Sequence, residues 1–442
     1  MEKNLTTGSV FRNAIYFSLP YLLAYFLQTL YGMADLFIIG QFEGVASTTA
    51  VSIGSQVMHM LTVMLVGLAM GTTVSIGQAV GAGDRKKAAR DIGNTVVLFL
   101  TVALVLMAVL LVLVKPIVSV MSTPEEAAEG TAAYLTICFI GIPFITAYNI
   151  ISSIFRGMGD SKSPMYFIAV ACVANIVLDY FFMGVLRLGP AGAALGTTLS
   201  QAISVVVSLA VIWKQKLIVL EKGDFAPQKP VMGSILKIGV PIAMQDGLIQ
   251  IAFIVITVIA NQRGLNDAAA VGIVEKVISF LFLVPSSMLS TVSALGAQNI
   301  GAGKPQRAAQ TLRYAILLAA GFGLAVAVAV QFVAEPIVAL FTDGTEVIRL
   351  GGQYLRGYIW DCVFAGIHFS FSGYFCACGK SGLSFLHNIV AIALVRVPGV
   401  YLTSRLFPTT LFPMGLATAA GSLLSVIICL IAFAVIRRKA EG

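Results

Sequence analysis

Long apolar runs, each about as long as a membrane-spanning helix, recur from one end of this 442-residue chain to the other. A helix needs roughly 20 mainly apolar residues to cross the hydrocarbon core of a bilayer. Twelve such runs lie between polar or turn-rich breaks, at about 13–40, 47–78, 92–114, 131–156, 164–186, 192–213, 234–260, 268–298, 311–334, 350–376, 384–406 and 414–436. They lack the short alternating pattern of a membrane β-barrel. The sequence therefore predicts an all-α integral membrane protein with twelve transmembrane helices.

The composition excludes most other classes of protein. Only 11% of the residues are charged and 58% are apolar, whereas a soluble chain has about 25% and 45–50%. A soluble enzyme, a disordered scaffold and a secreted disulfide domain are therefore excluded, and we expect no enzymatic activity. The net charge of +8 is interpreted as a signal of membrane orientation, and we expect no nucleic-acid partner.

Basic residues alternate sharply between successive connections. Twenty of the 28 Lys and Arg residues fall in the connections of one side and six in those of the other, while Lys276 and Arg396 fall inside predicted spans. By the positive-inside rule, the richer side is cytoplasmic. We therefore expect a multi-pass protein of the cell membrane with both termini in the cytoplasm.

The chain repeats itself at an offset of about 220 residues. The segment from Gln78 to Ala89, QAVGAGDRKKAA, matches the segment from Gln298 to Ala309, QNIGAGKPQRAA. Each half holds six runs, so the repeat is parallel and suits two lobes that rock about a central cavity. We predict lobes at 1–213 and 234–442, joined by a cytoplasmic linker at 214–233. Since no channel filter or nucleotide domain is visible, the energy must come from an ion gradient or another protein.

Two carboxylates lie deep in predicted spans of the first half, where an ionisable residue is costly and indicates function. Asp35 shares a helical face with Tyr31, and Asp179 shares one with Asn175, because each pair is spaced i, i+4. Carboxylate, amide and hydroxyl oxygens suit a hard cation such as Na⁺. Two close carboxylates could instead hold a proton, because one of them then binds it more readily. Both alternatives stay open.

These residues carry a family resemblance. The whole chain resembles the multidrug and toxic compound extrusion (MATE) family, and its DinF-like and MepA-like branches more than its NorM branch. The resemblance depends on the two homologous halves, the Gly-Gln-x-x-Gly-Ala-Gly loop at Gly77–Gly83, the Arg-Gly-Met-Gly-Asp segment at Arg156–Asp160, and the Asn175-x-x-x-Asp179 pair.

The resemblance implies roles for individual residues of the first lobe. It implies a cation-coupling site, holding Na⁺ if the protein is sodium-coupled, at Asp35, Asn175, Asp179 and Thr197. It implies a substrate pocket or surrounding network at Gln28, Tyr31 and Asn149. It also implies that Pro20 is a conformational hinge in the first helix, where a proline can kink the helix and free backbone carbonyls.

The second lobe departs from the NorM branch, which places acidic residues in the seventh and tenth spans. Ile249 or Gln250 stands at the seventh-span position, and Asp361 falls several residues from the tenth-span position. Coupling at a NorM-like second site is therefore not expected. The residues predicted to lie in a second-lobe cavity are Asp246, Gln250, Glu275, Asp361 and Arg396. The three histidines are dispersed along the sequence and suggest no metal site.

Together these features predict an antiporter that exports amphipathic, cationic organic compounds, including drugs, by rocker-switch alternating access. Its coupling ion would be Na⁺ or H⁺, with no other cofactor, and it would act as a monomer in the lipid bilayer. An alternative is a lipid-linked-precursor flippase of the same superfamily, although such flippases usually have more spans and a strongly cationic cavity. A membrane protein that binds a partner without transport is a third possibility, which the repeat and the paired acids disfavour.

Overall fold

A computed structural model describes residues 4–215 and 220–441 of the chain. Most of these residues are helical, and no strand occurs among them. In chain order the α-helices are α1 (Val10–Phe42), α2 (Val45–Gly81), α3 (Arg85–Val120), α4 (Glu125–Ile140), α5 (Ile142–Gly157), α6 (Lys162–Asp179), α7 (Gly189–Gln215), α8 (Lys229–Asn261), α9 (Leu265–Leu281), α10 (Leu283–Gly301), α11 (Pro305–Ala339), α12 (Thr345–Tyr358), α13 (Asp361–Ala377), α14 (Gly382–Ala391), α15 (Val397–Leu406) and α16 (Phe412–Glu441). Two π-helical segments, η1 (Tyr180–Val185) and η3 (Ile392–Arg396), and a 3₁₀ segment, η2 (Lys222–Phe225), complete the set.

The predicted apolar runs coincide with these helices, singly or as broken pairs. Among the described residues, ten helical segments are long and apolar enough to cross a membrane, or eleven if α4 and α5, bent by 49°, form one span. The remaining run, predicted at 350–376, falls in α12 and α13 and contains the charged residues Arg356 and Asp361. These charges lower its hydropathy without changing its helical character. The predicted all-α membrane architecture is confirmed.

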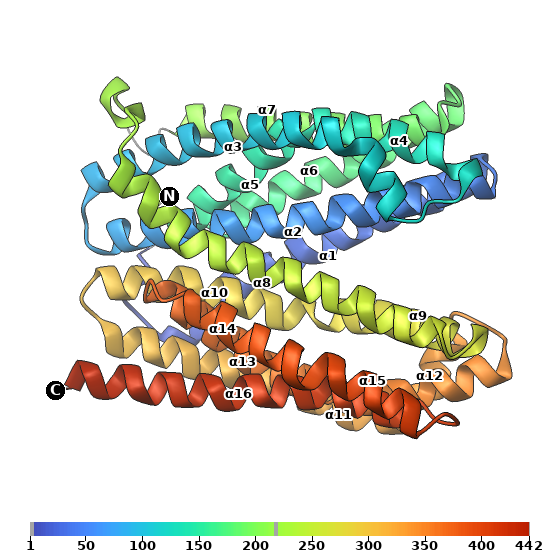
Figure 1. Cartoon of the computed structure of the whole chain (residues 1–442). Helices are drawn as coiled ribbons and strands as arrows, with labels where there is room; N and C mark the ends of the chain where they lie inside the picture. The colour runs from blue at the N-terminus through green and yellow to red at the C-terminus, as the bar shows by residue number, and fades with distance from the viewer. Residues whose placement is uncertain (1–3, 216–219, 442) are drawn as a thin grey trace. The chain divides into compact units, whose positions relative to one another are not determined.

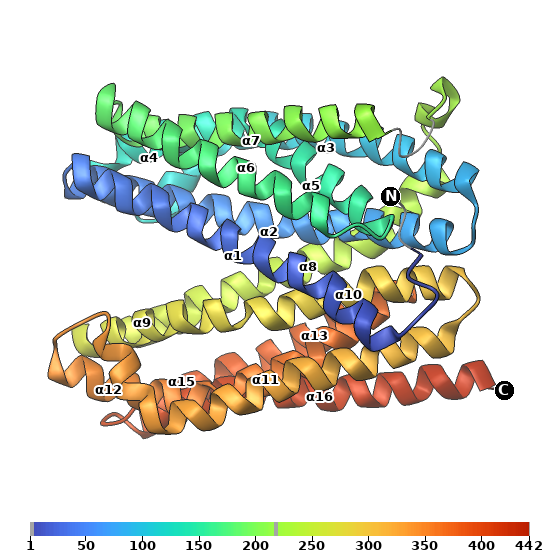
Figure 2. The ribbon, with the colours of Figure 1, turned by 180° about the vertical axis from the view of Figure 1, so that it is seen from behind.

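Packing divides the chain into two compact units. Unit 1 contains Met1–Leu5 and Leu19–Gly239, and unit 2 contains Thr6–Ser18 and Val240–Gly442. Within unit 1, α6 lies along α7 and α2 along α5 (Figure 1). Within unit 2, α10 and α11 both lie along α13 (Figure 2). The lobes predicted at 1–213 and 234–442 follow the sequence repeat and stay a prediction; part of their linker, 216–219, lies outside the described residues.

Helices α1 and α8 are each divided between the two units, next to a proline. The division in α1 falls between Ser18 and Leu19, just before Pro20, and the division in α8 falls just before Val240 and Pro241. A proline inside a helix removes one backbone hydrogen bond and favours a bend there. The two long helices are therefore weakest at the points where they pass from one unit to the other.

Hydrogen bonds and ring packing within unit 2 hold its N-terminal segment, Thr6–Ser18. The Arg307 guanidinium donates two hydrogen bonds of 3.1 Å to the Gly8 carbonyl, and Lys304 Nζ donates one of 3.0 Å to the Thr6 carbonyl. The rings of Phe11 and Tyr314 meet edge to face at 5.4 Å between centroids. This segment is thus bound by both charge and apolar packing.

Glycines let the first part of α8 approach α2 closely within unit 1. A side chain at Gly71 would overlap the Ile235 carbonyl, and one at Gly239 would overlap the Leu68 carbonyl. Two helices can come this close only where small residues line the contact. The segment of α8 before Pro241 is therefore packed as part of unit 1.

The sequence repeat extends to backbone conformation. Gly83 and Gly303 lie at equivalent turns with φ of +72° and +70°, and Gly159 and Gly379 lie at another pair with φ of +90° and +68°. This left-handed region strains any residue with a side chain. The repeated glycines are therefore explained by the geometry of the turns between helices.

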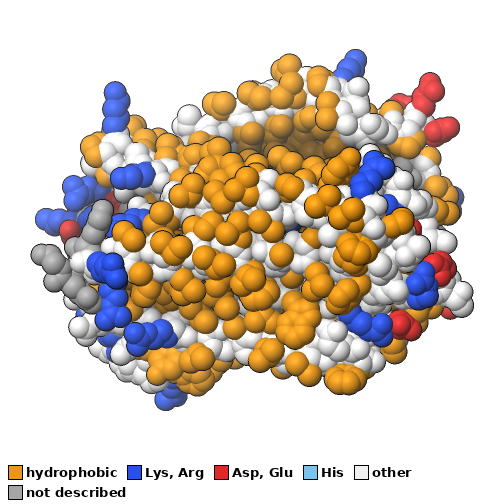
Figure 3. Space-filling view, turned by 60° about the horizontal axis from the view of Figure 1, so that its bottom comes forward, with side chains coloured by type: hydrophobic (Ala, Val, Ile, Leu, Met, Phe, Trp, Pro, Cys, Tyr) orange, Lys and Arg blue, Asp and Glu red, His pale blue; other side chains and the backbone are white. Residues whose placement is uncertain are grey.

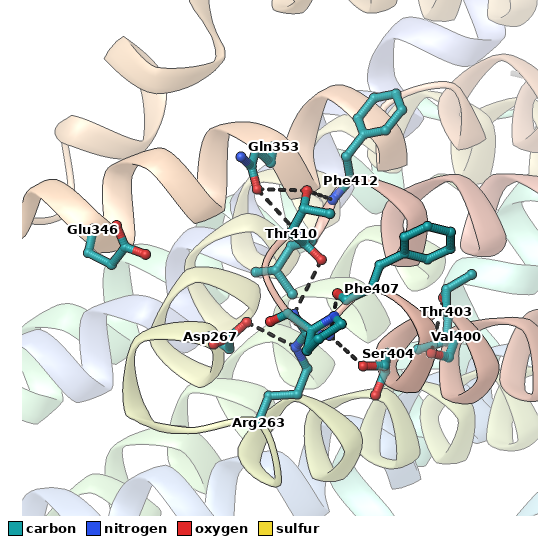
Figure 4. A network of polar contacts seen from close by, with 12 residues as sticks. Arg263, Asp267, Glu346, Gln353, Val400, Thr403, Ser404, Phe407, Thr410 and Phe412 are labelled. Atoms are coloured by element: carbon teal, nitrogen blue, oxygen red, sulfur yellow. Dashed lines mark hydrogen bonds and ion pairs between the residues drawn. The ribbon is translucent and has the colours of Figure 1, made fainter.

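Arg263 fastens two connections of unit 2 to each other (Figure 4). Its guanidinium donates hydrogen bonds to four carbonyls and to a carboxylate: those of Ser404 (2.7 Å), Phe407 (3.1 Å), Pro408 (2.9 Å) and Thr410 (3.2 Å), and Asp267 Oδ1 (3.0 Å). An arginine has five N–H donors in a fixed fork, so it can satisfy several acceptors at once. The connection between α8 and α9 is thereby tied to the connection between α15 and α16.

Apolar side chains form a broad band on the face drawn in Figure 3, and charged side chains gather mainly at the two margins of that band. Large exposed apolar residues of α11, such as Leu317, Leu324 and Phe332, belong to this kind of surface. In water such an extended apolar surface would be unfavourable, whereas lipid tails match it. The surface therefore agrees with the membrane class predicted from the sequence.

Candidate functional site

Four residues predicted from the sequence meet inside unit 1. Asp35 comes from α1, Asn175 and Asp179 come from the end of α6, and Thr197 comes from α7. All four are buried, and Asp35 and Asp179 are 2% and 0% exposed. Thr197 Oγ1 donates a hydrogen bond of 3.0 Å to Asp35 Oδ2, and the side chains of Asn175 and Asp179 interact with the Asp35 carboxylate. We call these four residues the Asp35–Asp179 cluster.

The cluster has more acceptors than donors. Within the described part of the chain, five of its buried polar atoms have no hydrogen-bond partner: Asp35 Oδ1, both carboxylate oxygens of Asp179, and Oδ1 and Nδ2 of Asn175. Four of these five atoms are acceptors. A buried carboxylate that lacks a donor or a counter-charge is strongly unfavourable. A bound cation or proton would therefore stabilise the carboxylates of the cluster.

Local backbone features fix the position of Asp179. It is the last residue of α6, and the π-helical segment η1 follows it directly. Single π-helical turns inside helices occur frequently at functional sites. On the facing helix, Gly196 leaves room for the carboxylate, since a Cβ there would overlap Asp179 Oδ1. The glycine next to Thr197 thus brings α7 against the cluster.

The other predicted residues of the first lobe lie at different distances from this cluster. Tyr31 is close to it, because its hydroxyl donates to the Thr197 carbonyl at 3.5 Å and interacts with Asp35. Gln28 is half-buried one turn earlier on α1. Asn149 is buried, but its amide donates to the Ile145 carbonyl of its own helix at 2.8 Å. Tyr31 is therefore the network residue most directly joined to the cluster.

The donor set fits two kinds of positive charge. In the described ranges, no three His, Cys, Asp or Glu side chains come together as they would around a metal ion. The Asp35–Asp179 cluster instead combines two carboxylates with amide and hydroxyl oxygens, the hard donors that suit Na⁺. A proton shared by the two carboxylates would relieve their repulsion as well. The residues present therefore fit either coupling ion named above.

The predicted second-lobe residues do not all meet. Arg396 forms an ion pair with Asp361, and both side chains are buried. Glu275 lies near this pair, interacting electrostatically with Arg396, and its Oε2 accepts a hydrogen bond of 3.2 Å from Thr257 Oγ1. Asp246 interacts instead with Gln245 and Cys376. Gln250 is half-buried on the same helix.

Sequence reasoning missed two buried contacts. His368 and His387, treated as dispersed, lie with ring centroids 5.5 Å apart, and His387 Nε2 lies 2.9 Å from the Ser372 hydroxyl. The Arg156 guanidinium lies over the Tyr21 ring at 4.2 Å, directly after the Pro20 position. The i, i+4 spacing of His368 and Ser372 was the only sequence signal for the first contact. Nothing in the sequence linked Arg156 to α1.

Comparison with known proteins decides the family. The sequence profile described as MatE matches residues 20–181 and again 241–402, which is more than half of the chain. The chain belongs to the MatE family. The two matched stretches are the two halves of the repeat, and Asp35, Asn175 and Asp179 of this MatE protein lie in the first of them. The resemblance to this family stated from the sequence is thereby confirmed.

Similar proteins cover nearly the whole chain. The probable multidrug resistance protein YpnP of Bacillus subtilis is 29% identical, covering 89% of this chain and 88% of its own. The multidrug export protein MepA of Staphylococcus aureus is 24% identical (91% and 89%), and an FAD transporter of Shewanella oneidensis is 24% identical (89% and 88%).

Solved structures share the fold of this MatE protein. A crystal structure of MATE in complex with MaL6 has a TM-score of 0.92 at 22% identity and covers 99% of both chains. A MOP superfamily transporter from Pyrococcus furiosus also has a TM-score of 0.92 at 22% identity, covering 99% of this chain and 98% of its own. The all-α fold of the chain is therefore the fold of these transporters.

Proposed function

We propose that this MatE protein is a cation-coupled antiporter that exports amphipathic, cationic organic compounds and so contributes to drug resistance. It would act as a monomer in the cell membrane, with both termini in the cytoplasm. The named functions of its relatives, probable multidrug resistance and multidrug export, support the substrate class. The asymmetry of basic residues between the two sets of connections supports the orientation.

The observation that carries the proposal is the excess of unpartnered acceptors in the Asp35–Asp179 cluster. Na⁺ or H⁺ entering from outside would neutralise it, and the export of a compound would be linked to that event. Linkage requires that the ion and the compound bind two conformations of the protein with different affinities. Pro20 supports such a link, because α1 carries Asp35 and is weakened at Pro20.

Transport by purified protein in lipid vesicles tests the proposal. Asp35→Asn and Asp179→Asn should each lower gradient-driven dye efflux by about tenfold or more, since a nearby charge shifts a proton-binding equilibrium by about one pKa unit or more. Sodium and pH gradients imposed independently would identify the coupling ion. The dye panel should include an anionic compound, because one relative is an FAD transporter.

Asp84→Asn is the matched control. Asp84 is an exposed acid that caps α3, its Oδ1 accepting a hydrogen bond of 2.8 Å from the Lys87 backbone. Asn caps helices about as well as Asp, so this variant should transport like the natural protein. Undiminished efflux in both Asp35→Asn and Asp179→Asn would contradict ion coupling at the cluster.

A further inference from the structure

Unit 2 contains a buried polar group of its own, made of residues from three helical segments. Asp361 begins α13, Arg396 ends η3, and Glu275 lies on α9. Asp361 is 0% and Arg396 9% exposed, and their side chains form an ion pair. The guanidinium also lies 5.8 Å from the centre of the Phe253 ring. We call Asp361, Arg396 and Glu275 the Arg396 cluster.

The repeat relates this cluster to the one in unit 1. The two stretches that match the MatE profile start at residues 20 and 241, an offset of 221. The glycine pair nearest to Asn175, Gly159 and Gly379, is 220 residues apart, so Asn175 corresponds to Val395 or Arg396. At either offset the positions of Asp35 and Asp179 carry no carboxylate, since they hold Val255 or Ile256 and Gly399 or Val400. The second half therefore lacks both carboxylates at these positions and carries a fixed positive charge at or directly next to the position of the Asn175 amide.

Asp179 and Arg396 each pack against a glycine of the next long helix. In unit 1, Gly196 of α7 lies against Asp179, and in unit 2, Gly421 of α16 lies against Arg396, where a Cβ would crowd the Cβ of the arginine. Thr197 and Ser422 directly follow these glycines. In each unit, a charged residue from the broken helix thus lies next to a glycine of the following long helix.

The unpartnered atoms of the two clusters differ in kind. In unit 1, four of five are acceptors, and no cationic side chain is among the four cluster residues. In the Arg396 cluster, the buried atoms without a partner in the described residues are one acceptor each of Asp361 and Glu275 and the donor Arg396 Nε. The hydroxyls of Tyr354 and Tyr358, which interact electrostatically with the cluster and can both donate and accept, have no partner either. Water molecules can form hydrogen bonds with such a mixed set of donors and acceptors. The Arg396 guanidinium already supplies a positive charge to the two carboxylates.

We infer that Arg396 is a tethered counter-ion that takes, in unit 2, the role of the coupling cation, so that the Arg396 cluster binds no transported ion. The inference rests on the proposed function of the Asp35–Asp179 cluster. An arginine stays protonated at every physiological pH, and it cannot dissociate from the protein. Asp361 would then be neutralised throughout the cycle, and ion coupling would be confined to unit 1.

Removing the guanidinium should create an ion site where none existed. Arg396→Met leaves the Asp361 and Glu275 carboxylates without their cation, so they should take up Na⁺ or H⁺. We expect affinity for that ion to rise by about tenfold or more, as loss of a neighbouring positive charge commonly produces. Arg396→Lys keeps the charge and should gain no site. Arg396→Met combined with Asp361→Asn should lose most of the gain.

Trp360 provides a local reporter, because it directly precedes Asp361, and the other tryptophan is Trp213 of α7. The experiment uses the full chain with Trp213→Phe, Asp35→Asn and Asp179→Asn, so that the unit 1 cluster is disabled and Trp360 alone is observed. Its fluorescence is titrated with NaCl at fixed pH, against choline chloride, and with pH in the absence of Na⁺. Binding of ²²Na⁺ is measured in parallel.

With Arg396 present, we expect no saturable response, and with Arg396→Met or Arg396→Gln we expect one. A saturable response in the Arg396 protein that Asp361→Asn or Glu275→Gln removes would overturn the inference, because unit 2 would then bind the ion beside its arginine. Absence of a response in both neutral variants, folded as judged by circular dichroism, would overturn it as well. Neither result depends on transport, so failure here is distinct from failure of the proposed function.

Discussion

At the scale of single residues, scarcity of charge made the unit 1 site predictable. With 11% charged residues in the sequence, two acids at membrane depth stand out, because such positions are costly without a function. The i, i+4 spacing of Asn175 and Asp179 placed both on one helix face. The sequence suggested that Gly196 allows close helix packing, but not that it lies against Asp179, because that depends on the distance between α6 and α7.

Gly196→Ala should weaken ion coupling without unfolding the protein. The added Cβ would overlap Asp179 Oδ1, so the carboxylate must move, and overpacking of this kind costs about 1–3 kcal/mol. We expect the initial rate of gradient-driven efflux to fall by about fivefold or more, which corresponds to about 1 kcal/mol. Vesicle efflux and the thermal unfolding midpoint are the measurements.

Gly321→Ala is the control for that change. Gly321 lies inside α11, and a Cβ there meets no atom within 4 Å. This variant should keep both its transport rate and its stability. A Gly196→Ala protein with the same rate as Gly321→Ala would show that the position of Asp179 is not critical.

The pairing of Asp361 with Arg396 and the contact of His368 with His387 were beyond sequence reasoning. Each joins residues of different helices, and their separations along the chain follow no helical or strand period. The sequence indicated that Arg396 lay inside a span but not which acid it faced. Long-range pairing in the membrane depends on helix register, which single-sequence patterns do not specify.

At the scale of helices, the apolar runs predicted nearly every element but none of the breaks. The run at about 131–156 consists of α4 and α5, bent by 49° at Gly141. A Cβ at Gly141 would crowd the Thr198 side chain, so the bend is tied to α7 packing. The two π-helical segments likewise leave no mark in hydropathy, because each lies inside one of the predicted runs.

Arg263→Met should destabilise unit 2. The change removes a guanidinium whose side chain is 8% exposed and which serves four carbonyls and Asp267. Hydrogen bonds from charged groups contribute about 1.5–3 kcal/mol each, but water can replace part of them at the membrane margin. We expect a loss of about 2 kcal/mol or more, visible as a lower thermal unfolding midpoint.

Arg349→Met provides the comparison. Arg349 pairs with Glu346 on an exposed turn of α12, where the side chains are 46% and 49% exposed. Exposed ion pairs contribute little to stability, so this variant should unfold near the midpoint of the natural protein. Equal midpoints for Arg263→Met and Arg349→Met would mean that the Arg263 contacts do not hold the two connections together.

At the scale of the whole molecule, packing and sequence repeat divide the chain at different places. The repeat predicts halves that meet in the linker, whereas the compact units divide α1 at Leu19 and α8 at Val240. A hydropathy pattern reports which segments are helical, but it contains no information on which neighbours a helix packs against at each end. The assignment of the first part of α1 to unit 2, and of the first part of α8 to unit 1, was therefore not predictable.

Arg307→Ala should loosen the segment from Thr6 to Ser18 and little else. Its guanidinium makes both hydrogen bonds to the Gly8 carbonyl and one of 3.2 Å to Asn299 Oδ1. Hydrogen exchange followed by mass spectrometry should show faster exchange before Pro20, by about fivefold or more for a loss near 1 kcal/mol. The α1 segment after Pro20, which belongs to unit 1, should keep its protection. Equal acceleration on both sides of Pro20 would contradict the division of α1.

The exchange of the first parts of α1 and α8 has a consequence for how such a protein could have originated. If a single six-helix half were made alone, its own first helical segment would have nothing to pack against. The surface that normally packs against the first segment of the other half would be exposed. Two copies could supply these segments to each other by domain swapping, which is a low-cost route to a dimer. If the two halves arose in this way, fusion of the two genes would have kept the contacts of the swapped pair within one molecule.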